Sequence, residues 1–394
     1  MGKNEKQAYL KQIYKRYQKA NKSEKSLILN EFCAVCGYHR KHALRLLKKG
    51  RLQRRTKAKP QETRGRQPRY EHEKILPILK TVWKCADFMC SKRLKAALPE
   101  WLPHYPKTLD TAIEQQLLSI SAASIDRLLK PFRAQNIRKG LSGTRPGSLL
   151  KNQIPIKTHH WDVSEPGFLE ADTVAHCGNS LAGDFVWSLT MTDILTTWTE
   201  CRATWNKGAH GVCEQVKSIE DMLPFPIQGF DCDNGSEFLN YHLIRYFTDE
   251  PRKHRIAFTR SRPYHKDDNA HVEQKNWTHV RQLFGYDRLD NPKLVELMND
   301  LYANEWSLYQ NHFCPTNKLV EKIKINSKYR RKYDKPKTPF QRLLECEQID
   351  QETKTLIQNI HQKLNPFQLK NDIEKKLKTI FAFVTISTDV RARI

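Results

Sequence analysis

The chain has 394 residues and a formal net charge of +25, with 68 Lys and Arg against 43 Asp and Glu. A surplus this large indicates a polyanionic partner, most simply a nucleic acid, and the length predicts two to four domains rather than one. The charged N-terminus and the absence of any apolar run near about 20 residues argue against a secretory signal and a membrane span, so we expect a cytoplasmic protein.

The first fifty residues predict three helices. Residues 5–20 place apolar side chains at helical spacing, Ser23 is a candidate cap for a second helix, and Gly37 ends that helix before a basic third one. Two helices joined by a short Gly-containing turn are typical of a helix-turn-helix over residues 1–50. The residues then expected to face DNA are Tyr38, Arg40, Lys41, Arg45 and Lys48, with Ala43, Leu44 and Leu47 packed inward. The alternative is a basic amphipathic helix that only covers the core.

The ten cysteines are scattered through the chain, as in a protein of a reducing compartment. Cys33, Cys36, His39 and His42 have a spacing that resembles a zinc site. They fall at every third residue across one helix-turn-helix, without the long loop that would fold two ligand pairs together. We therefore do not expect zinc here.

A basic linker is predicted over residues 51–72, followed by a second helical module over 73–133. Residues 75–89 have helical spacing, and a further helix pair flanks Ser119–Ser121. Arg127 and Lys130 are expected on the outer face of that pair and are candidate DNA contacts. The module is either a second helix-turn-helix or a helical spacer.

A second linker, 134–160, precedes a change to strand-forming composition. The expected strands are 167–176, 184–193, 198–205, 229–233 and 256–259, and the expected helices are 212–222, 236–246, 269–284 and 292–309. Three strands followed by alternating helices and strands predict an α/β core over 161–312. Residues 313–394 are predicted to form a basic C-terminal region whose last fifty residues contact DNA, another copy of the chain, or both.

Three acidic residues stand at notable places in this core. Asp172 ends the run Phe-Leu-Glu-Ala-Asp, Asp233 leads into Asp-Asn-Gly-Ser-Glu-Phe, and Glu273 lies in Val-Glu-Gln-Lys-Asn on a polar helix. Two acids at strand ends and one on a helix are the ligand types that a divalent cation needs for phosphoryl transfer. Asp231 competes with Asp233, because residues two apart in a strand share a face; the Asn-Gly turn after Asp233 favours Asp233.

These three motifs, in this order, resemble the catalytic core of retroviral integrases and, more strongly, the integrase-like DDE transposases of bacterial insertion sequences. The second acid lies 61 residues after the first, and the third lies 40 residues after the second. The resemblance covers roughly residues 160–345. It implies a ribonuclease-H-like catalytic core, with a mixed five-stranded sheet and helices, whose first and fourth strands are adjacent. The whole chain is then multidomain, with all-α modules before the core.

The resemblance also implies roles and partners. Asp172, Asp233 and Glu273 would be the catalytic residues and the ligands of two Mg²⁺ ions, with Mn²⁺ as a substitute. The partners would be double-stranded DNA, as terminal inverted repeats and as target, and at least a second copy of the chain, since two DNA ends must be brought together. No small-molecule cofactor and no membrane are expected, and the protein would associate with the nucleoid when bound.

Further cations surround the third acid. Arg260, Arg262, Lys266 and Lys275 are candidate contacts for the phosphates of the scissile strand, or else solvated charges. Asp267 and Asp268 compete with Glu273 but stand where acids favour the start of its helix. Two other functions stay open: a nuclease of the same fold that cuts without joining, and a DNA-binding regulator with a decayed core. The intact acids argue against the regulator.

Overall fold

A computed structural model describes residues 2–49, 70–135, 163–232, 237–238, 241–248, 256–260, 270–325 and 328–384. The chain forms two compact units, Met1–Arg69 and Tyr70–Ile394. Both predicted linkers fall almost entirely outside the described residues. The predicted boundaries between the second helical module, the α/β core and the C-terminal region lie inside the second unit.

The first unit contains three helices, α1 (Lys3–Lys19), α2 (Lys22–Cys36) and α3 (Arg40–Lys49), as predicted. Gly37 ends α2 in the left-handed conformation, with φ 67°, which glycine adopts without the steric cost of a Cβ. The expected cap at Ser23 is wrong. Asn21 caps the helix instead, because its side chain accepts from the N–H of Glu24, and Ser23 lies inside the first turn.

The second unit begins with four helices, α4 (His72–Cys85), α5 (Ser91–Trp101), α6 (Thr111–Ser119) and α7 (Ala122–Gln135). The helix pair around residues 119–121 is confirmed. The single helix expected over 75–89 is shorter, because Asp87 and Phe88 take φ of 50° and 58° and turn the chain into α5.

A mixed five-stranded sheet follows. Its strands are β1 (Phe168–Ala175), β2 (Val186–Asp193), β3 (Thr199–Trp205), β4 (Gly229–Cys232) and β5 (Ala257–Arg260), in the spatial order β3-β2-β1-β4-β5. The pairs β1–β2 and β2–β3 are antiparallel, whereas β1–β4 and β4–β5 are parallel. The strand positions match the prediction closely, and the adjacency of the first and fourth strands, which only the resemblance implied, is present.

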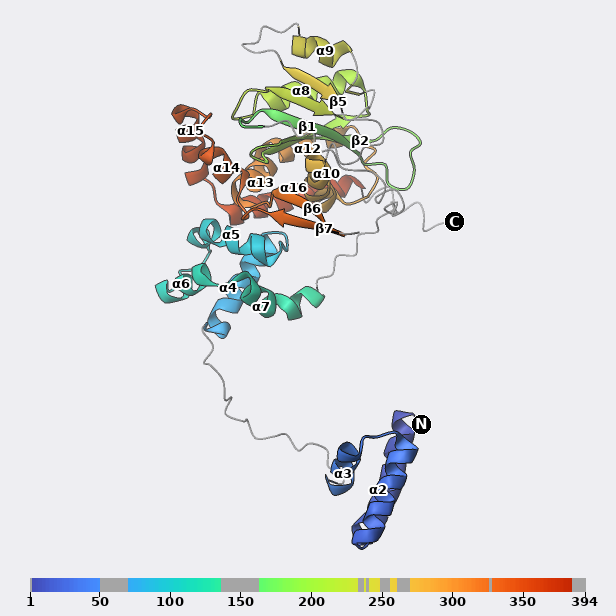
Figure 1. The fold of residues 1–394 in the computed structure, drawn as a ribbon. Coiled ribbons are helices and arrows are strands. Elements are labelled where there is room, and N and C mark those ends of the chain that lie inside the picture. The colour runs from blue at the N-terminus through green and yellow to red at the C-terminus, as the bar shows by residue number, and fades with distance from the viewer. Residues whose placement is uncertain are drawn as a thin grey trace. The chain divides into compact units, whose positions relative to one another are not determined.

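Helices cover both faces of the sheet (Figure 1). On one face, α8 (Ala209–Glu220) and α9 (Tyr241–Thr248) pack over a core that includes Leu169, Ala171 and Phe230. The other face, which includes Val174 and Ala203, packs against helices from the second half of the chain. These are α10 (Ala270–Lys275), η3 (Asn276–Arg281), α11 (Gln282–Phe284), α12 (Lys293–Leu301), η4 (Tyr302–Trp306), α13 (Ser307–Phe313) and α16 (Pro366–Val384).

The two long helices expected over 269–284 and 292–309 each contain a π-helical segment. The first is η3, which starts at Asn276, and the second is η4. A π-helical segment shifts the side chains that follow it around the helix axis and is frequent at functional sites. Neither π-helical segment was predicted from the sequence.

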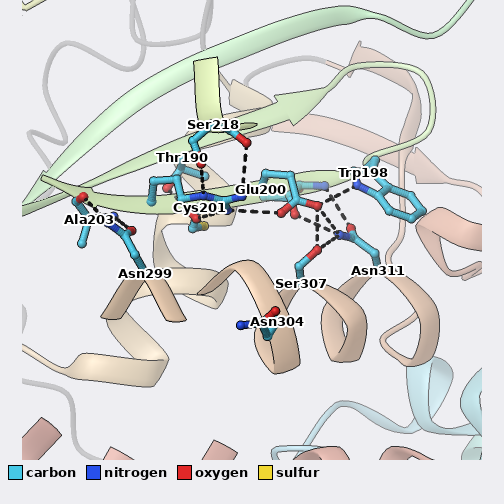
Figure 2. Close-up of polar contacts among 12 residues, drawn as sticks. Thr190, Trp198, Glu200, Cys201, Ala203, Ser218, Asn299, Asn304, Ser307 and Asn311 are labelled. Atoms are coloured by element: carbon cyan, nitrogen blue, oxygen red, sulfur yellow. Dashed lines mark hydrogen bonds and ion pairs between the residues drawn. The ribbon is translucent and has the colours of Figure 1, made fainter. Parts of the chain in front are cut away.

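The outer edge of β3 is closed by side chains of α12 and α13 (Figure 2). Asn311 bonds both the N–H and the C=O of Thr199, and Asn299 does the same for Ala203, at 2.6 to 3.0 Å. Between them, the guanidinium of Arg202 donates to the C=O of Cys201 at 2.7 Å. Each asparagine amide thus occupies the place of a neighbouring strand's peptide group.

A buried carboxylate accompanies this edge. Glu200 is 2% exposed and accepts from Ser307, Trp198 and Asn311, while its second oxygen lies 3.7 Å from Arg202. Burial raises the pKa of Glu200, against the hydrogen bond from Ser307 and the charge of Arg202. Through these hydrogen bonds, the carboxylate of Glu200 links β3 to α13.

The helices at both ends of the second unit pack against the sheet-bearing core. Trp101 is fully buried, with its ring 5.1 Å from Phe367 and 6.1 Å from Tyr309, and its indole N–H donates to the C=O of Phe313 at 3.1 Å. The C-terminal elements are β6 (Leu319–Ile325), β7 (Lys328–Tyr333), α14 (Pro339–Glu345), α15 (Gln351–Gln362) and α16. The last of these helices begins at Pro366. None of the helices in the described parts of the chain is long and apolar enough to span a membrane.

Candidate functional site

Of the three predicted acids, the structure describes the side chain of Asp172 alone. Asp172 lies in β1 and is half-buried. Glu273 lies in α10, but its side chain is outside the described residues, as are Asp233, Asp267 and Asp268.

Both carboxylate oxygens of Asp172 accept hydrogen bonds. Asn276 donates from Nδ2 to Oδ2 at 2.6 Å, and the backbone N–H of Thr173 donates to Oδ1 at 2.7 Å. Asn276 is the first residue of the π-helical segment η3 and the last residue of the Val-Glu-x-x-Asn motif. Hydrogen bonds to the ionised form hold a carboxylate in one orientation, so Asn276 fixes how Asp172 faces its surroundings.

The pairing of β1 with β4 ends one residue before each of the first two predicted acids. The last parallel pair is Ala171 with Cys232, and Asp172 and Asp233 are each the next residue along the chain. One pair earlier, Glu170 lies beside Asp231, which accepts from Thr259 of β5 at 2.7 Å. The competing acid Asp231 thus lies within β4, one residue before the end of the strand.

The helix that carries Glu273 is fixed to the same face as Asp172. Glu170, two residues before Asp172 and therefore on the same face of β1, is 4% exposed. Its carboxylate accepts from the backbone N–H of Val272 in α10 at 3.0 Å. This bond serves an N–H in the first turn of the helix and places the backbone of Glu273, the next residue, close to β1.

A second carboxylate near Asp172 was not assigned a role from the sequence. Glu237 is 1% exposed, accepts from Thr173 at 3.1 Å and pairs with Lys207 at 2.5 Å. The signal for it was present, because Glu237 is the acid of the Asp-Asn-Gly-x-Glu-Phe motif. Lys207 lies in the short connection between β3 and α8, and no feature of the sequence indicated that it would contact this site.

The structure corrects the expectation that Lys275 contacts DNA. Lys275 is 6% exposed, and its ammonium donates to the C=O of Thr197 at 3.2 Å, in the turn between β2 and β3. Lys275 was expected to be accessible because it lies in a basic stretch of the sequence, but the packing of α10 on the sheet turns its side chain inward. Burial, helped by the charges of Arg93 and Arg342, lowers the pKa of Lys275 to about 7.

This burial predicts a pH dependence of stability. As the pH falls from 10.5, the ordinary pKa of a lysine, to about 7, the unfolded chain takes up a proton that the folded chain does not. Stability therefore falls with falling pH in that window, by up to about 1.4 kcal/mol per pH unit from this group. Lys275→Met should flatten the dependence in denaturant titrations at pH 7.5, 8.5 and 9.5. Identical slopes for the two proteins would contradict the burial of a neutral lysine.

The other predicted DNA contacts are placed as follows. Arg40, Lys41, Arg45 and Lys48 are exposed on α3, and Arg127 and Lys130 are exposed on α7. Tyr38 is half-buried, with its ring 5.6 Å from Phe32, so it packs partly inside the first unit. Ala43 and Leu47 are fully buried, as expected. Arg262, Lys266 and the side chain of Arg260 lie outside the described residues.

Among the described residues, no three His, Cys, Asp or Glu side chains are grouped so that they could hold a metal ion. Two of the three predicted ligands are outside that set. The described donor, Asp172, has the chemistry that Mg²⁺ favours: it is a carboxylate at the end of a strand pair, half-exposed and oriented by an amide.

The fold and this site define an α/β protein whose mixed five-stranded sheet carries an oriented aspartate at the β1–β4 junction and has helices on both faces. The chain is 37% identical over 337 residues to an uncharacterised protein, y4rM, of Sinorhizobium fredii (strain NBRC 101917 / NGR234), covering 84% of this chain and 92% of that protein. The chain belongs to the same family as this rhizobial protein. No protein-family model matches it.

Among solved structures, the chain is similar to the catalytic core domain of BIV integrase. The identity is 12%, the overlap covers 37% of this chain and 83% of that chain, and the TM-score is 0.26. These values are too low for the likeness to support a conclusion.

Proposed function

We propose that this protein is a DNA transposase that binds the terminal inverted repeats of its own element and catalyses cleavage and transfer of DNA strands. The observation that carries the proposal is the bond between Asn276 and Asp172. It joins the first and third acidic motifs of the sequence in space, as a shared catalytic site requires. The net charge of +25 supports a polyanionic substrate.

Asp172, Asp233 and Glu273 would together hold two Mg²⁺ ions. When bound, the ions supply charge stabilisation for in-line displacement at phosphorus and lower the pKa of an attacking water or 3′-hydroxyl. The work of the chain is positioning. Asn276 orients the carboxylate of Asp172, and Glu170 fixes the helix of Glu273 beside it.

Asn276→Ala should lower the cleavage rate by about 10–100-fold and raise the Mg²⁺ concentration needed for half-maximal cleavage, because an outer partner of a metal ligand is lost. Gln274→Ala is the matched control, because Gln274 is exposed in α10 and lies two residues before Asn276; it should leave both quantities unchanged. A metal titration on a labelled DNA substrate measures them. Wild-type metal dependence in Asn276→Ala would show that this amide does not serve the site.

DNA recognition is assigned to the all-α parts of the chain. The exposed cations of α3 follow a turn of three residues after α2, a geometry that suits a helix-turn-helix. The cations of α7 provide a second candidate surface. A regulator or a nuclease of the same fold would use the same contacts, so binding alone does not separate these functions.

The test is a cleavage and strand-transfer assay with purified protein and DNA that carries the repeats flanking the gene, with Mg²⁺ or with EDTA. We expect metal-dependent nicking at the repeat end and a joined product. Cutting without joining would indicate the nuclease, and binding without any metal-dependent cut would indicate the regulator.

A further inference from the structure

The strands β6 and β7 form a two-stranded antiparallel sheet of their own, which we term the ribbon (Leu319–Ile325 and Lys328–Tyr333). Leu319 lies opposite Tyr333, and Ile323 lies opposite Arg330. The sequence indicated only a basic C-terminal region here. The structure shows that the basic residues lie on a two-stranded antiparallel sheet.

The ribbon is both cationic and apolar on its surface. Arg330, Arg331 and Lys332 are exposed and consecutive, and because successive residues of a strand point to opposite faces, both faces carry positive charge. Glu321 is the one acid in either strand. Val320 is 63% exposed and Tyr333 53% exposed. Exposed apolar side chains among cations mark a contact surface for a partner that is itself charged and partly apolar.

The base of the ribbon is firmly attached to the core. Lys318 and Asp334 exchange two hydrogen bonds at 2.7 and 3.0 Å, and Arg342 pairs with Asp334 at 2.6 Å. Next to them, Thr316 and Lys337 exchange backbone hydrogen bonds at 2.8 and 3.2 Å. An isolated two-stranded hairpin is marginal in water, so these contacts hold the ribbon in a defined direction.

The same base is connected to the candidate site. The hydroxyl of Thr316 lies 2.9 Å from that of Thr197, and the C=O of Thr197 accepts from Lys275. The next residue, Asn276, donates to Asp172. A short series of contacts therefore runs from the ribbon to the acid that is proposed to do the chemistry.

We propose that the ribbon inserts into the major groove of the DNA duplex on which the candidate site acts. This groove, about 12 Å wide, admits a two-stranded β-ribbon, and a row of phosphates borders it on each side. Cations on both faces of the ribbon match those two rows, whereas an acidic protein surface would engage one face. The exposed Val320 and Ile323 suit contacts with thymine methyl groups. The proposal rests on the proposed function for the identity of the duplex.

The first experiment measures binding of the full chain to a fluorescent duplex in EDTA, so that cleavage does not enter. The triple variant Arg330→Ala, Arg331→Ala, Lys332→Ala should bind at least about tenfold more weakly, and the slope of log K against log salt should fall by up to about 3, near 0.9 per phosphate contact. The control is a second triple variant, which removes the same charge from exposed positions outside the ribbon and should bind like the wild type: Lys84→Ala, Lys293→Ala, Lys378→Ala. Glu321→Gln should bind more tightly.

A second measurement tests the groove. Wild-type protein should protect guanine N7, a major-groove atom, from methylation over a short segment, and the ribbon variant should lose that protection. Equal binding and equal protection in the two proteins would overturn the ribbon proposal and leave the proposed function standing. A wild-type chain that binds no duplex would overturn the proposed function and the ribbon proposal together.

Discussion

Asp172→Asn should abolish DNA strand cleavage, with a loss of at least about a thousandfold, while leaving binding of the DNA ends nearly unchanged. The substitution keeps the shape of the side chain but removes the charge, and the several kcal/mol of transition-state stabilisation that a metal-held carboxylate supplies is lost. The same result is expected for Asp233→Asn and for Glu273→Gln. Single-turnover cleavage and a binding titration on one substrate measure the two effects separately.

Asp184→Asn is the matched control, since Asp184 is an exposed acid ahead of β2 and away from this site. Asp231→Asn tests the competing assignment and should retain most of the cleavage activity. Near wild-type cleavage by any one of the three main variants would remove that residue from the catalytic set. Loss in Asp231→Asn with retention in Asp233→Asn would exchange the two aspartates.

Trp101→Ala should destabilise the second unit by about 3–5 kcal/mol. The indole is fully buried between α5, α13 and α16, so its removal leaves a cavity where three parts of the chain meet, and an unpaired C=O at Phe313. We expect α4–α7 to become accessible to protease before the sheet does. Denaturant unfolding, followed by limited proteolysis, measures both.

Trp277→Ala makes the same chemical change at a side chain that is 44% exposed and should destabilise the protein clearly less than Trp101→Ala, because less apolar surface is lost. Trp101→Phe keeps a ring in the cavity and should cost less than the alanine variant. If Trp101→Ala unfolded like the wild type, the helices α4–α7 would be a separate domain, as the sequence predicted, rather than part of one unit.

The sheet was predictable because its strands have two strong local signals, apolar runs and turn residues that bound them. Each predicted strand overlaps the observed one almost fully, and the three-strand, then alternating, order follows from this. The adjacency of β1 and β4 was not derivable in that way. It is a long-range pairing between residues about 60 apart, and its source was the resemblance of the motifs.

The features that were not predicted also depend on packing between distant parts of the chain or lack a local sequence signal. Lys275 is buried because of how α10 packs, and a single lysine in a basic stretch carries no sign of that. The ribbon was missed because its strands alternate apolar and basic residues on surfaces that are both exposed, so the usual contrast between a buried and a solvated face is absent. Asn276 was part of the Val-Glu-x-x-Asn motif, but its contact with Asp172 depends on how the helix packs on β1 and was not predicted.

The closed edge of β3 limits how copies of this chain can associate. A strand edge normally offers free N–H and C=O groups on which a strand of another molecule can form, both in working assemblies and in aggregates. Here Asn299 and Asn311 already hold both groups of Ala203 and of Thr199, and Arg202 holds the C=O of Cys201. In the proposed transposase, copies brought together on two DNA ends would therefore not associate through a sheet continued past the β3 edge, which leaves β5 as the other edge strand of this sheet.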